Sequence, residues 1–267
     1  MCTLAVKPKG VATPKTEYLK NMFKNNPNGA GVAWACGGKI NVVKGLMTEA
    51  DFLKACDKIP VDAVALIHCR ITTSGGTCKE LTHPFRLCSD IKEMRKTKAI
   101  YESGCVVGHN GIFNEFKTKD LNNDTTQFII TYLNNLQSVA ERGGVSILCE
   151  EYKPIINQLV NGSRLAILNA EGGCCIYGSG WQTCEGVYYS NGNYKPYEPV
   201  YYNNYNSYGN YSKYNNYFKE YCKTIHNEDL KEYAKDASLK KEILKLKADG
   251  YSEWQILNYI EGGYLDY

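Results

Sequence analysis

Residues 62–68 form a nearly unbroken apolar run with the length of one strand. A strand with one solvated face alternates apolar and polar residues, so this run predicts a strand that is covered on both faces. Residues 105–108 form a second short apolar run of the same kind. A chain of 267 residues can bury a core large enough to cover such strands, so we expect one large domain with room for an appendage.

The surrounding patterns predict a mixture of strands and helices. Two strand-like runs at residues 31–36 and 40–43 are separated by a Gly-Gly turn, which predicts a hairpin. Thr48 and Asp51 have the spacing of a capping box, which predicts a helix that continues to about residue 58. Further strands are expected at residues 2–6, 164–170 and 174–177, and further helices at 128–136 and 151–160. The predicted fold class is therefore α+β.

Polar motifs follow both of the apolar runs. The first run leads into Arg70 and a glycine pair at residues 75–76, and the second leads into His109, Asn110 and Gly111. A strand end gives a side chain rigid support, and a glycine beside it lets a ligand approach the backbone closely. These two segments are therefore candidate parts of a functional site.

Cys2 follows the first methionine, and cysteine is small enough for that methionine to be removed readily. Removal would leave Cys2 with a thiol and a free α-amino group whose ordinary pKa is about 8. Such an amine can act as the base for its own thiol, so this nucleophile would need no catalytic histidine. Many cytosolic proteins begin with Met-Cys and make no such use of the cysteine, so position alone leaves both interpretations open.

The order of these motifs resembles that of the class II glutamine amidotransferase (glutaminase) domain of the N-terminal-nucleophile hydrolases. The similarity spans residues 2–185. It consists of Cys2, an arginine after a buried strand, His-Asn-Gly after the next strand, and Asp124-Thr125 before a helix. It implies a four-layer αββα sandwich of two stacked, mostly antiparallel sheets between helical layers. It also implies hydrolysis of L-glutamine to L-glutamate and ammonia through a thioester on Cys2, without a metal or cofactor.

The same resemblance assigns roles around the amide that is cleaved. Cys2 is the nucleophile, and the donors to the oxyanion of the tetrahedral intermediate are the side-chain amide of Asn110 and the backbone N–H of Gly111. An Asn-Gly pair is also a common tight turn, and such a turn could present both donors. Because the terminal amine supplies the base, we assign no chemistry to the histidines that flank the predicted strands.

Free glutamine carries a carboxylate and an ammonium group, so its pocket needs one cation and one anion. Arg70 suits the carboxylate because its planar fork can donate to both oxygens, and the family's Arg-x-x-Thr pattern adds Thr73. Asp124 suits the ammonium group, although Asp-Thr-Thr-Gln is also a helix N-cap sequence. A structural ion pair is the alternative for Arg70. Ser74 stands where relatives often have histidine, and Thr3 where many have glycine, so binding of free glutamine is less firmly implied than hydrolysis.

Composition divides the chain into three parts. Residues 2–190 hold all of these motifs, residues 191–220 are mostly tyrosine and asparagine, and residues 221–267 return to helical patterns. The Tyr/Asn stretch has too few aliphatic residues to build a core, so we expect a linker. Stacking of its tyrosines on single-stranded nucleic acid is the alternative, but such sites also need a cationic groove.

The last part predicts a small helical module. Helices are expected to begin near residue 228, at Ser238 and at Ser252. We expect this module to dock the protein that consumes the ammonia. DNA binding by a helix-turn-helix around Gly250 is the weaker alternative, because the lysines are largely balanced by acidic residues.

Composition also limits the compartment and the partners. The formal net charge of +3 gives no argument for a nucleic-acid or membrane partner. No apolar run approaches about 18 residues and no signal-peptide pattern is present, so we expect a cytoplasmic protein. The twelve cysteines are scattered and form no Cys-x-x-Cys pair, which favours buried thiols in a reducing compartment over disulfides or a zinc site.

Nothing after residue 185 has the length or motifs of a synthetase, a sugar isomerase or a phosphoribosyltransferase. We therefore expect L-glutamine as substrate and a separate ammonia-accepting synthase as partner. Two alternatives stay open: a hydrolase with the same nucleophile that acts on another amide, and a catalytically inactive scaffold that binds a partner.

Overall fold

The computed structural model describes residues 1–72, 77–116, 123–196, 225, 228–248, 256–257 and 260. The chain divides into two compact units, Met1–Pro199 and Val200–Tyr267. Most of the predicted Tyr/Asn linker lies outside the described residues, so its expected role stays a prediction.

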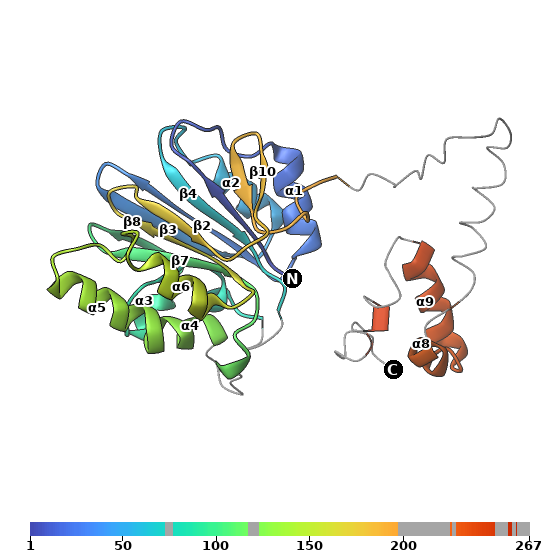
Figure 1. The fold of residues 1–267 in the computed structure, drawn as a ribbon. Coiled ribbons are helices and arrows are strands. Elements are labelled where there is room, and N and C mark those ends of the chain that lie inside the picture. The colour runs from blue at the N-terminus through green and yellow to red at the C-terminus, as the bar shows by residue number, and fades with distance from the viewer. Residues whose placement is uncertain are drawn as a thin grey trace, which may run out of the picture. The chain divides into compact units, whose positions relative to one another are not determined.

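Two antiparallel sheets form the centre of the first unit (Figure 1). The larger sheet has the order β10-β11-β1-β4-β2-β3-β6, and the smaller has the order β5-β7-β8-β9. The larger sheet consists of β1 (Thr3–Lys7), β2 (Ala30–Cys36), β3 (Lys39–Leu46), β4 (Val64–Cys69), β6 (Lys98–Tyr101), β10 (Gln182–Cys184) and β11 (Val187–Tyr189). The smaller sheet consists of β5 (Phe85–Arg86), β7 (Cys105–Asn110), β8 (Arg164–Asn169) and β9 (Cys174–Tyr177). The α+β class is confirmed.

The two sheets share a core. Leu4 of β1 and Leu66 of β4 belong to this shared core, and Val106 of β7 meets them from the smaller sheet. Their strand neighbours Ala5 and Ile67 belong instead to a second core on the opposite face of the larger sheet. Both faces of β4 are therefore covered, as its unbroken apolar sequence predicts.

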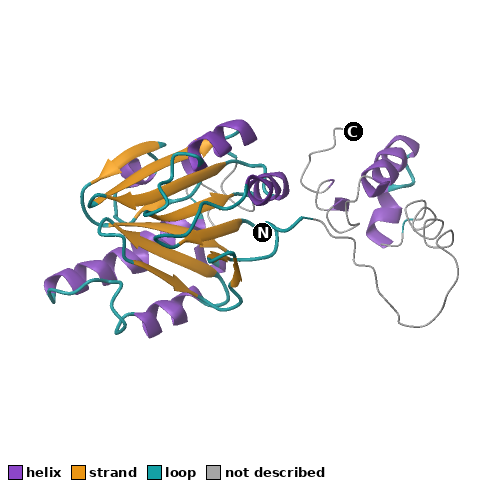
Figure 2. Ribbon diagram, turned by 90° about the horizontal axis from the view of Figure 1, so that it is seen from above, coloured by secondary structure: helices purple, strands orange, loops and turns teal. Residues whose placement is uncertain are grey.

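Helices pack on the outer face of each sheet (Figure 2). On the larger sheet, α1 (Thr16–Asn25) and α2 (Glu49–Cys56) supply Met22 and Phe52 to the outer core. On the smaller sheet, the core is completed by α4 (Asp124–Phe128), the π-helix η3 (Ile129–Leu133), α5 (Asn134–Arg142) and α6 (Lys153–Val160). These amphipathic helices form because each has one apolar face that the sheets bury.

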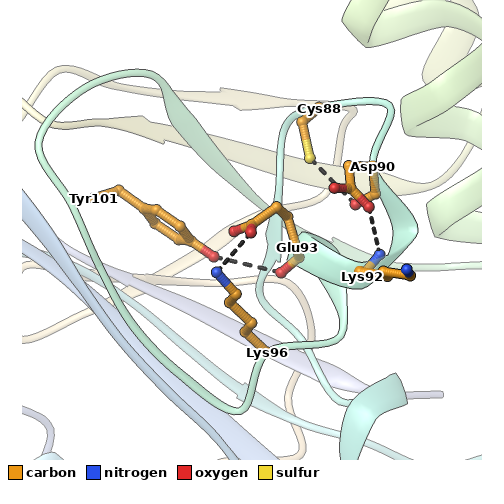
Figure 3. Close-up of polar contacts among 6 residues, drawn as sticks. All are labelled: Cys88, Asp90, Lys92, Glu93, Lys96 and Tyr101. Carbon is orange, nitrogen blue, oxygen red and sulfur yellow. Dashed lines mark hydrogen bonds and ion pairs between the residues drawn. The ribbon is translucent and has the colours of Figure 1, made fainter.

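The short helix α3 (Ile91–Met94) lies between β5 and β6, which are edge strands of different sheets. Figure 3 shows the contacts that hold it. Asp90 caps the helix, since its Oδ1 accepts a 2.8 Å hydrogen bond from the Lys92 N–H. The Glu93 carboxylate pairs with Lys96 at 2.6 Å, and the Glu93 carbonyl accepts a hydrogen bond from the Tyr101 hydroxyl. The crossing from one sheet to the other is thus fixed by local polar contacts.

Most of the longer elements agree with the sequence. The hairpin of β2 and β3, the α2 helix capped by Thr48, and the strands β4, β7, β8 and β9 lie where they are expected. The elements that the sequence did not predict are α1, α3, β5, β6, β10 and β11. Several of these are very short strands. Of them, β11 pairs with β1 and β5 pairs with β7, whereas β10 pairs with its neighbour β11.

The second unit contains α8 (Glu228–Tyr233) and α9 (Ala237–Ala248), around a small core that includes Leu230 and Ile243. The prediction that Ser238 caps a helix is wrong. Asp236 provides the cap, because its Oδ1 accepts hydrogen bonds from the N–H groups of Ser238 and Leu239, each at 2.9 Å. The helix expected from residue 252 and the turn around Gly250 lie mostly outside the described residues.

Two further short 3₁₀ turns, η1 (Lys79–Leu81) and η2 (Asn114–Phe116), complete the described elements of the first unit.

Candidate active site

The pairing of β1 with β4 brings Cys2 beside the segment that follows β4. Thr3 is opposite Cys69 in this antiparallel pair, so Cys2 faces the residues just beyond the strand end. The Ile71 N–H donates to Cys2 Sγ at 3.4 Å, and the Cys2 thiol reaches the Ile71 carbonyl at the same distance. Two backbone groups therefore hold the sulfur in place.

Arg70 directly precedes Ile71 and is held through its own backbone. Its N–H donates to the Gly29 carbonyl at 2.8 Å, and its carbonyl accepts a hydrogen bond from the Asn28 N–H at 3.0 Å. The Asn28 side chain extends this support, since its Oδ1 accepts a 2.9 Å hydrogen bond from the Thr72 N–H. The turn that contains Asn28 therefore supports the arginine segment directly.

The other side of the site begins where β7 ends. Gly111 has a φ of +153°, and a Cβ at this position would lie 2.0 Å from Ser163 Oγ, so only glycine fits. The Gly111 N–H makes no hydrogen bond with any residue that the structure describes. Asn110 is buried, and its Nδ2 donates to Ser190 Oγ at 2.8 Å.

Asp124 is the first residue of α4, and it does not cap that helix. The cap is Asn123, whose Oδ1 accepts a 2.9 Å hydrogen bond from the Thr126 N–H. The Asp124 carboxylate instead accepts hydrogen bonds from the N–H groups of Phe113 and Thr125, at 2.8 and 2.9 Å. The alternative interpretation of Asp124 as the N-cap is therefore wrong, and its carboxylate stays at the surface of the site.

Residues from these segments line one small cavity. Its volume is about 280 Å³ including the open mouth. It is formed by Cys2, Arg70, Ile71, His83, His109, Gly111, Asn123, Asp124 and Thr125. The cavity therefore joins four of the predicted site residues, which come from β1 and from the segments after β4, after β7 and at the start of α4.

The histidines form a buried cluster behind this cavity. Thr125 Oγ1 lies 2.8 Å from His109 Nδ1 and 3.2 Å from His83 Nε2, so it links the two rings. His68 Nε2 contacts the His109 carbonyl at 2.9 Å, and its ring packs against His83. His109 also stacks on Phe113, with ring centroids 4.1 Å apart. The cluster connects the two sheets at the edge of the site.

Burial dominates the electrostatics of the cluster and of the thiol. It lowers the pKa of His68 and of His109 to about 3, and it lowers that of His83 well below its ordinary value, so all three rings are neutral near pH 7. Burial raises the pKa of the Cys2 thiol, against the opposing effects of the Ile71 hydrogen bond and of the Arg70 charge. It also raises the pKa of the Asp124 carboxyl, although backbone N–H donors act in the other direction.

One predicted residue lies apart from this arrangement, and two others are not among the described residues. Thr73 and Ser74 fall outside the described residues, so their assignment to the substrate carboxylate stays a prediction. Asn110 does not line the cavity, because its amide is turned toward Ser190. Sequence reasoning missed His83 and Thr125 as lining residues. The His-Pro pair and the Asp-Thr pair were visible, but neither pattern shows that two side chains meet.

Sequence reasoning also missed a segment close to the end of the first unit. Residues 190–193 run beside residues 1–4, and their side chains contact the chain on both sides of Cys2. Such a contact joins positions nearly 190 residues apart and has no local signal in the sequence.

Within the described ranges of the chain, no cluster of three or more His, Cys, Asp or Glu side chains is arranged to hold a metal ion. In the same part of the chain, no helix has both the length and the apolar character that crossing a bilayer requires. Neither the protein-family models nor the curated proteins that were compared with this sequence gave a match.

Proposed function

We propose that the first unit is a glutamine-hydrolysing enzyme that uses Cys2 as its nucleophile after removal of Met1. The observation that carries this proposal is the cavity itself, which is lined by four of the predicted site residues: Cys2, Arg70, Gly111 and Asp124. A thiol, a cation, an anion and an N–H donor around one cavity are the groups that a zwitterionic amide substrate requires.

The first chemical step forms a bond between Cys2 Sγ and the side-chain carbonyl carbon of glutamine. The thiol proton passes to the liberated α-amine of Cys2, which then gives a proton to the departing nitrogen. The carbon–nitrogen bond breaks, ammonia leaves, and a γ-glutamyl thioester remains. Water, deprotonated by the same amine, then attacks the thioester, which releases glutamate and restores the thiol. Met1 is 66% exposed, which supports its accessibility to an aminopeptidase.

The oxyanion of both tetrahedral intermediates needs preorganised donors. The Gly111 N–H is one, since it lines the cavity and no described residue accepts its hydrogen bond. Asn110 supplies the second after a 180° rotation of its amide. In the present orientation, Asn110 Oδ1 has no hydrogen-bond partner among the described residues. In the rotated one, the Ser190 hydroxyl donates to Oδ1 and the Asn110 N–H groups are free to donate elsewhere.

Recognition of free glutamine follows from the two charged groups. Arg70 binds the substrate carboxylate with its planar fork, together with Thr73 and Ser74. Asp124 binds the ammonium group, and its carboxylate is held by two backbone N–H donors in a fixed orientation. Fixed charges of this kind bind a zwitterion without reorganising, which favours a free amino acid over a neutral amide.

The fold supports the same proposal. Two stacked antiparallel sheets with helices on both outer faces agree with the αββα arrangement of N-terminal-nucleophile hydrolases. The cysteines that the structure describes are all free thiols, which is compatible with the cytosol. We also propose that the ammonia is consumed by a separate synthase, and that the second unit docks it.

The test is treatment of the protein with a glutamine-mimicking electrophile, such as a diazo-ketone analogue, followed by peptide mapping and intact mass. We expect a single adduct at Cys2 in molecules that lack Met1, and none in Cys2→Ala. Adducts spread over several cysteines would contradict the proposal. Hydrolysis of glutamine and of a panel of acylated amines then separates the proposed substrate from another amide, and absence of all turnover in Met1-free protein would favour an inactive scaffold.

A further inference from the structure

A polar segment after β11 holds the Cys2 strand in place, and this segment lies almost 190 residues away in sequence. Asn191 Nδ2 donates to the Cys2 carbonyl at 2.7 Å, which is the shortest side-chain contact that Cys2 makes in the described structure. Asn191 Oδ1 accepts hydrogen bonds from the Thr3 hydroxyl at 3.0 Å and from the Asn193 N–H at 3.1 Å. One amide therefore fixes the peptide group that follows the sulfur-bearing residue.

Thr3 completes a buried chain of hydrogen bonds. Its hydroxyl donates to Asn191 and accepts from Asn26 Nδ2 at 3.0 Å, while Asn26 itself donates to the Met22 carbonyl at the end of α1. Thr3 and Asn26 are both fully buried. A glycine at position 3 could not make these contacts, so the threonine at this position has a specific partner. The amide of Asn191 is thus held at one end by a helix-anchored network and at the other end by Cys2.

The preceding residue links the same segment to the second side of the site. Ser190 Oγ accepts a 2.9 Å hydrogen bond from the Leu4 N–H and lies 2.8 Å from Asn110 Nδ2. The Ser190 N–H also donates to the Leu4 carbonyl at 2.9 Å. Two adjacent side chains therefore reach the nucleophile strand and the proposed oxyanion donor, although those groups belong to different sheets.

We infer that Asn191, supported by Thr3, is the positioning residue that aims the Cys2 sulfur, and that Ser190 keeps Asn110 in register with it. This inference rests on the proposed function, because what it positions is the proposed nucleophile. Hydrogen bonds to the carbonyl of a residue limit rotation of its backbone, and so they limit where its Sγ can point. A misplacement of about 1 Å at a nucleophile can lower the rate about 10²-fold.

The test compares Asn191→Ala, Thr3→Val and Thr3→Ser with a matched control, Asn193→Ala, in Met1-free protein. Among the described residues, the Asn193 side chain donates only to the Met1 carbonyl, so this contact is already absent after processing. For glutamine hydrolysis we expect kcat to fall about 10²-fold in Asn191→Ala and less in Thr3→Val, with KM changed by less than about threefold. Thr3→Ser keeps the hydroxyl and should retain the kcat of the parent protein. Asn193→Ala should also have the parent kcat.

Alkylation by iodoacetamide provides the second readout, mapped residue by residue. Release of the strand should expose Cys2, so its alkylation rate should rise in Asn191→Ala while its catalytic rate falls. Cys69, which is fully buried and pairs beside Thr3, should remain protected if the variant is folded. Faster labelling of both Cys2 and Cys69 would show that Asn191→Ala has opened the fold. The alkylation rate and kcat of Thr3→Val would then test the positioning role instead.

The outcomes separate the two proposals. An active parent protein with unchanged kcat in both Asn191→Ala and Thr3→Val would overturn the positioning role and leave the glutaminase intact. An inactive parent protein would overturn the glutaminase. In that case an unchanged Cys2 alkylation rate in both variants would overturn the positioning role as well, whereas a selective rise would support it.

Discussion

The two walls of the cavity are held by different kinds of interaction. The first wall is formed by Cys2, Arg70 and Ile71. The Arg70 backbone bonds to residues 28–29, and the Ile71 backbone bonds to Cys2 Sγ. The second wall contains Gly111, Asp124 and the histidines, and it is fixed by ring stacking and by the bonds of Thr125. The first wall is thus held largely through backbone groups, whereas the second also uses buried, neutral side chains as a rigid support.

The difference indicates a division of tasks. On the first wall, a charged and a nucleophilic side chain can line the cavity because backbone hydrogen bonds hold the segments that carry them. On the second wall, only the Asp124 carboxylate and the Gly111 N–H face the cavity as polar groups with a proposed task, and the imidazoles behind them remain neutral. We therefore expect substitutions on the first wall to change kinetics, and substitutions among the histidines to change stability and its dependence on pH.

The largest effect is expected at the nucleophile. Cys2→Ala should lower glutamine hydrolysis by more than about 10³-fold, because no other group in the cavity can form the thioester. The measurement is ammonia release at saturating glutamine, with a thermal melt to show that the variant is folded. Cys36, an exposed cysteine at the end of β2, gives the matched control, and Cys36→Ala should leave the rate unchanged. A Cys2→Ala rate within tenfold of the parent protein would contradict covalent catalysis at this residue.

Next in size is the loss of an oxyanion donor. Asn110→Ala should lower kcat about 10²–10³-fold with a smaller change in KM, because the donor acts on charge that develops after binding. Asn135 on α5 is an exposed asparagine whose side chain donates to the Thr131 carbonyl of the preceding η3, so Asn135→Ala is a suitable control. An Asn110→Ala variant that changes KM alone would instead place this residue in substrate binding.

Arg70→Lys should have a smaller effect, and mainly on binding. A lysine keeps the charge but loses the planar fork, so KM for glutamine should rise about 10–100-fold, in line with the roughly 1.5–3 kcal/mol of a hydrogen bond to a charged group. The kcat at saturation should change much less. Equal losses in kcat and kcat/KM would show that the guanidinium acts in the transition state, and the first wall would then combine binding and catalysis.

The smallest effect concerns the histidine cluster. The native state holds the pKa of His109 near 3 instead of the ordinary 6.5, so between these values the unfolded chain binds a proton that the native state does not. Stability should therefore fall as pH decreases from 6.5 toward 3, by up to about 1.4 kcal/mol per pH unit for each such histidine. His109→Asn removes one titrating group.

Denaturant unfolding of the parent protein and of His109→Asn at several pH values between 4 and 6 measures this effect. The slope of unfolding free energy against pH should be smaller in the variant by about 1.4 kcal/mol per unit, whatever its absolute stability. Identical slopes would show that His109 is already protonated in the native state, and the second wall would then carry charge.

Several features of the fold could be predicted from local patterns. The apolar run before His68 requires a strand with both faces covered, and β4 is such a strand. The spacing of Thr48 and Asp51 places the start of α2, and Thr48 accepts the hydrogen bond of the Asp51 N–H. The pattern was misleading at Ser238, because the helix begins two residues earlier, where Asp236 Oδ1 accepts the N–H groups of Ser238 and Leu239. Strands as short as β10 and β11 carry no periodic signal of their own, and their pairing with each other and with β1 defines them.

The candidate site was partly visible for the same reason. The sequence by itself determined which residues could do chemistry: a thiol at position 2, an arginine after a buried strand, an Asn-Gly pair and an aspartate before a helix. Only the tertiary structure decided that Cys2, Arg70, Gly111 and Asp124 share a cavity, and that Ser190 and Asn191 hold the first strand. The physical reason is the separation along the sequence of the residues that interact. Helix caps and strand periodicity depend on neighbours a few residues apart, whereas contacts across 60 to 190 residues depend on how two sheets pair and pack.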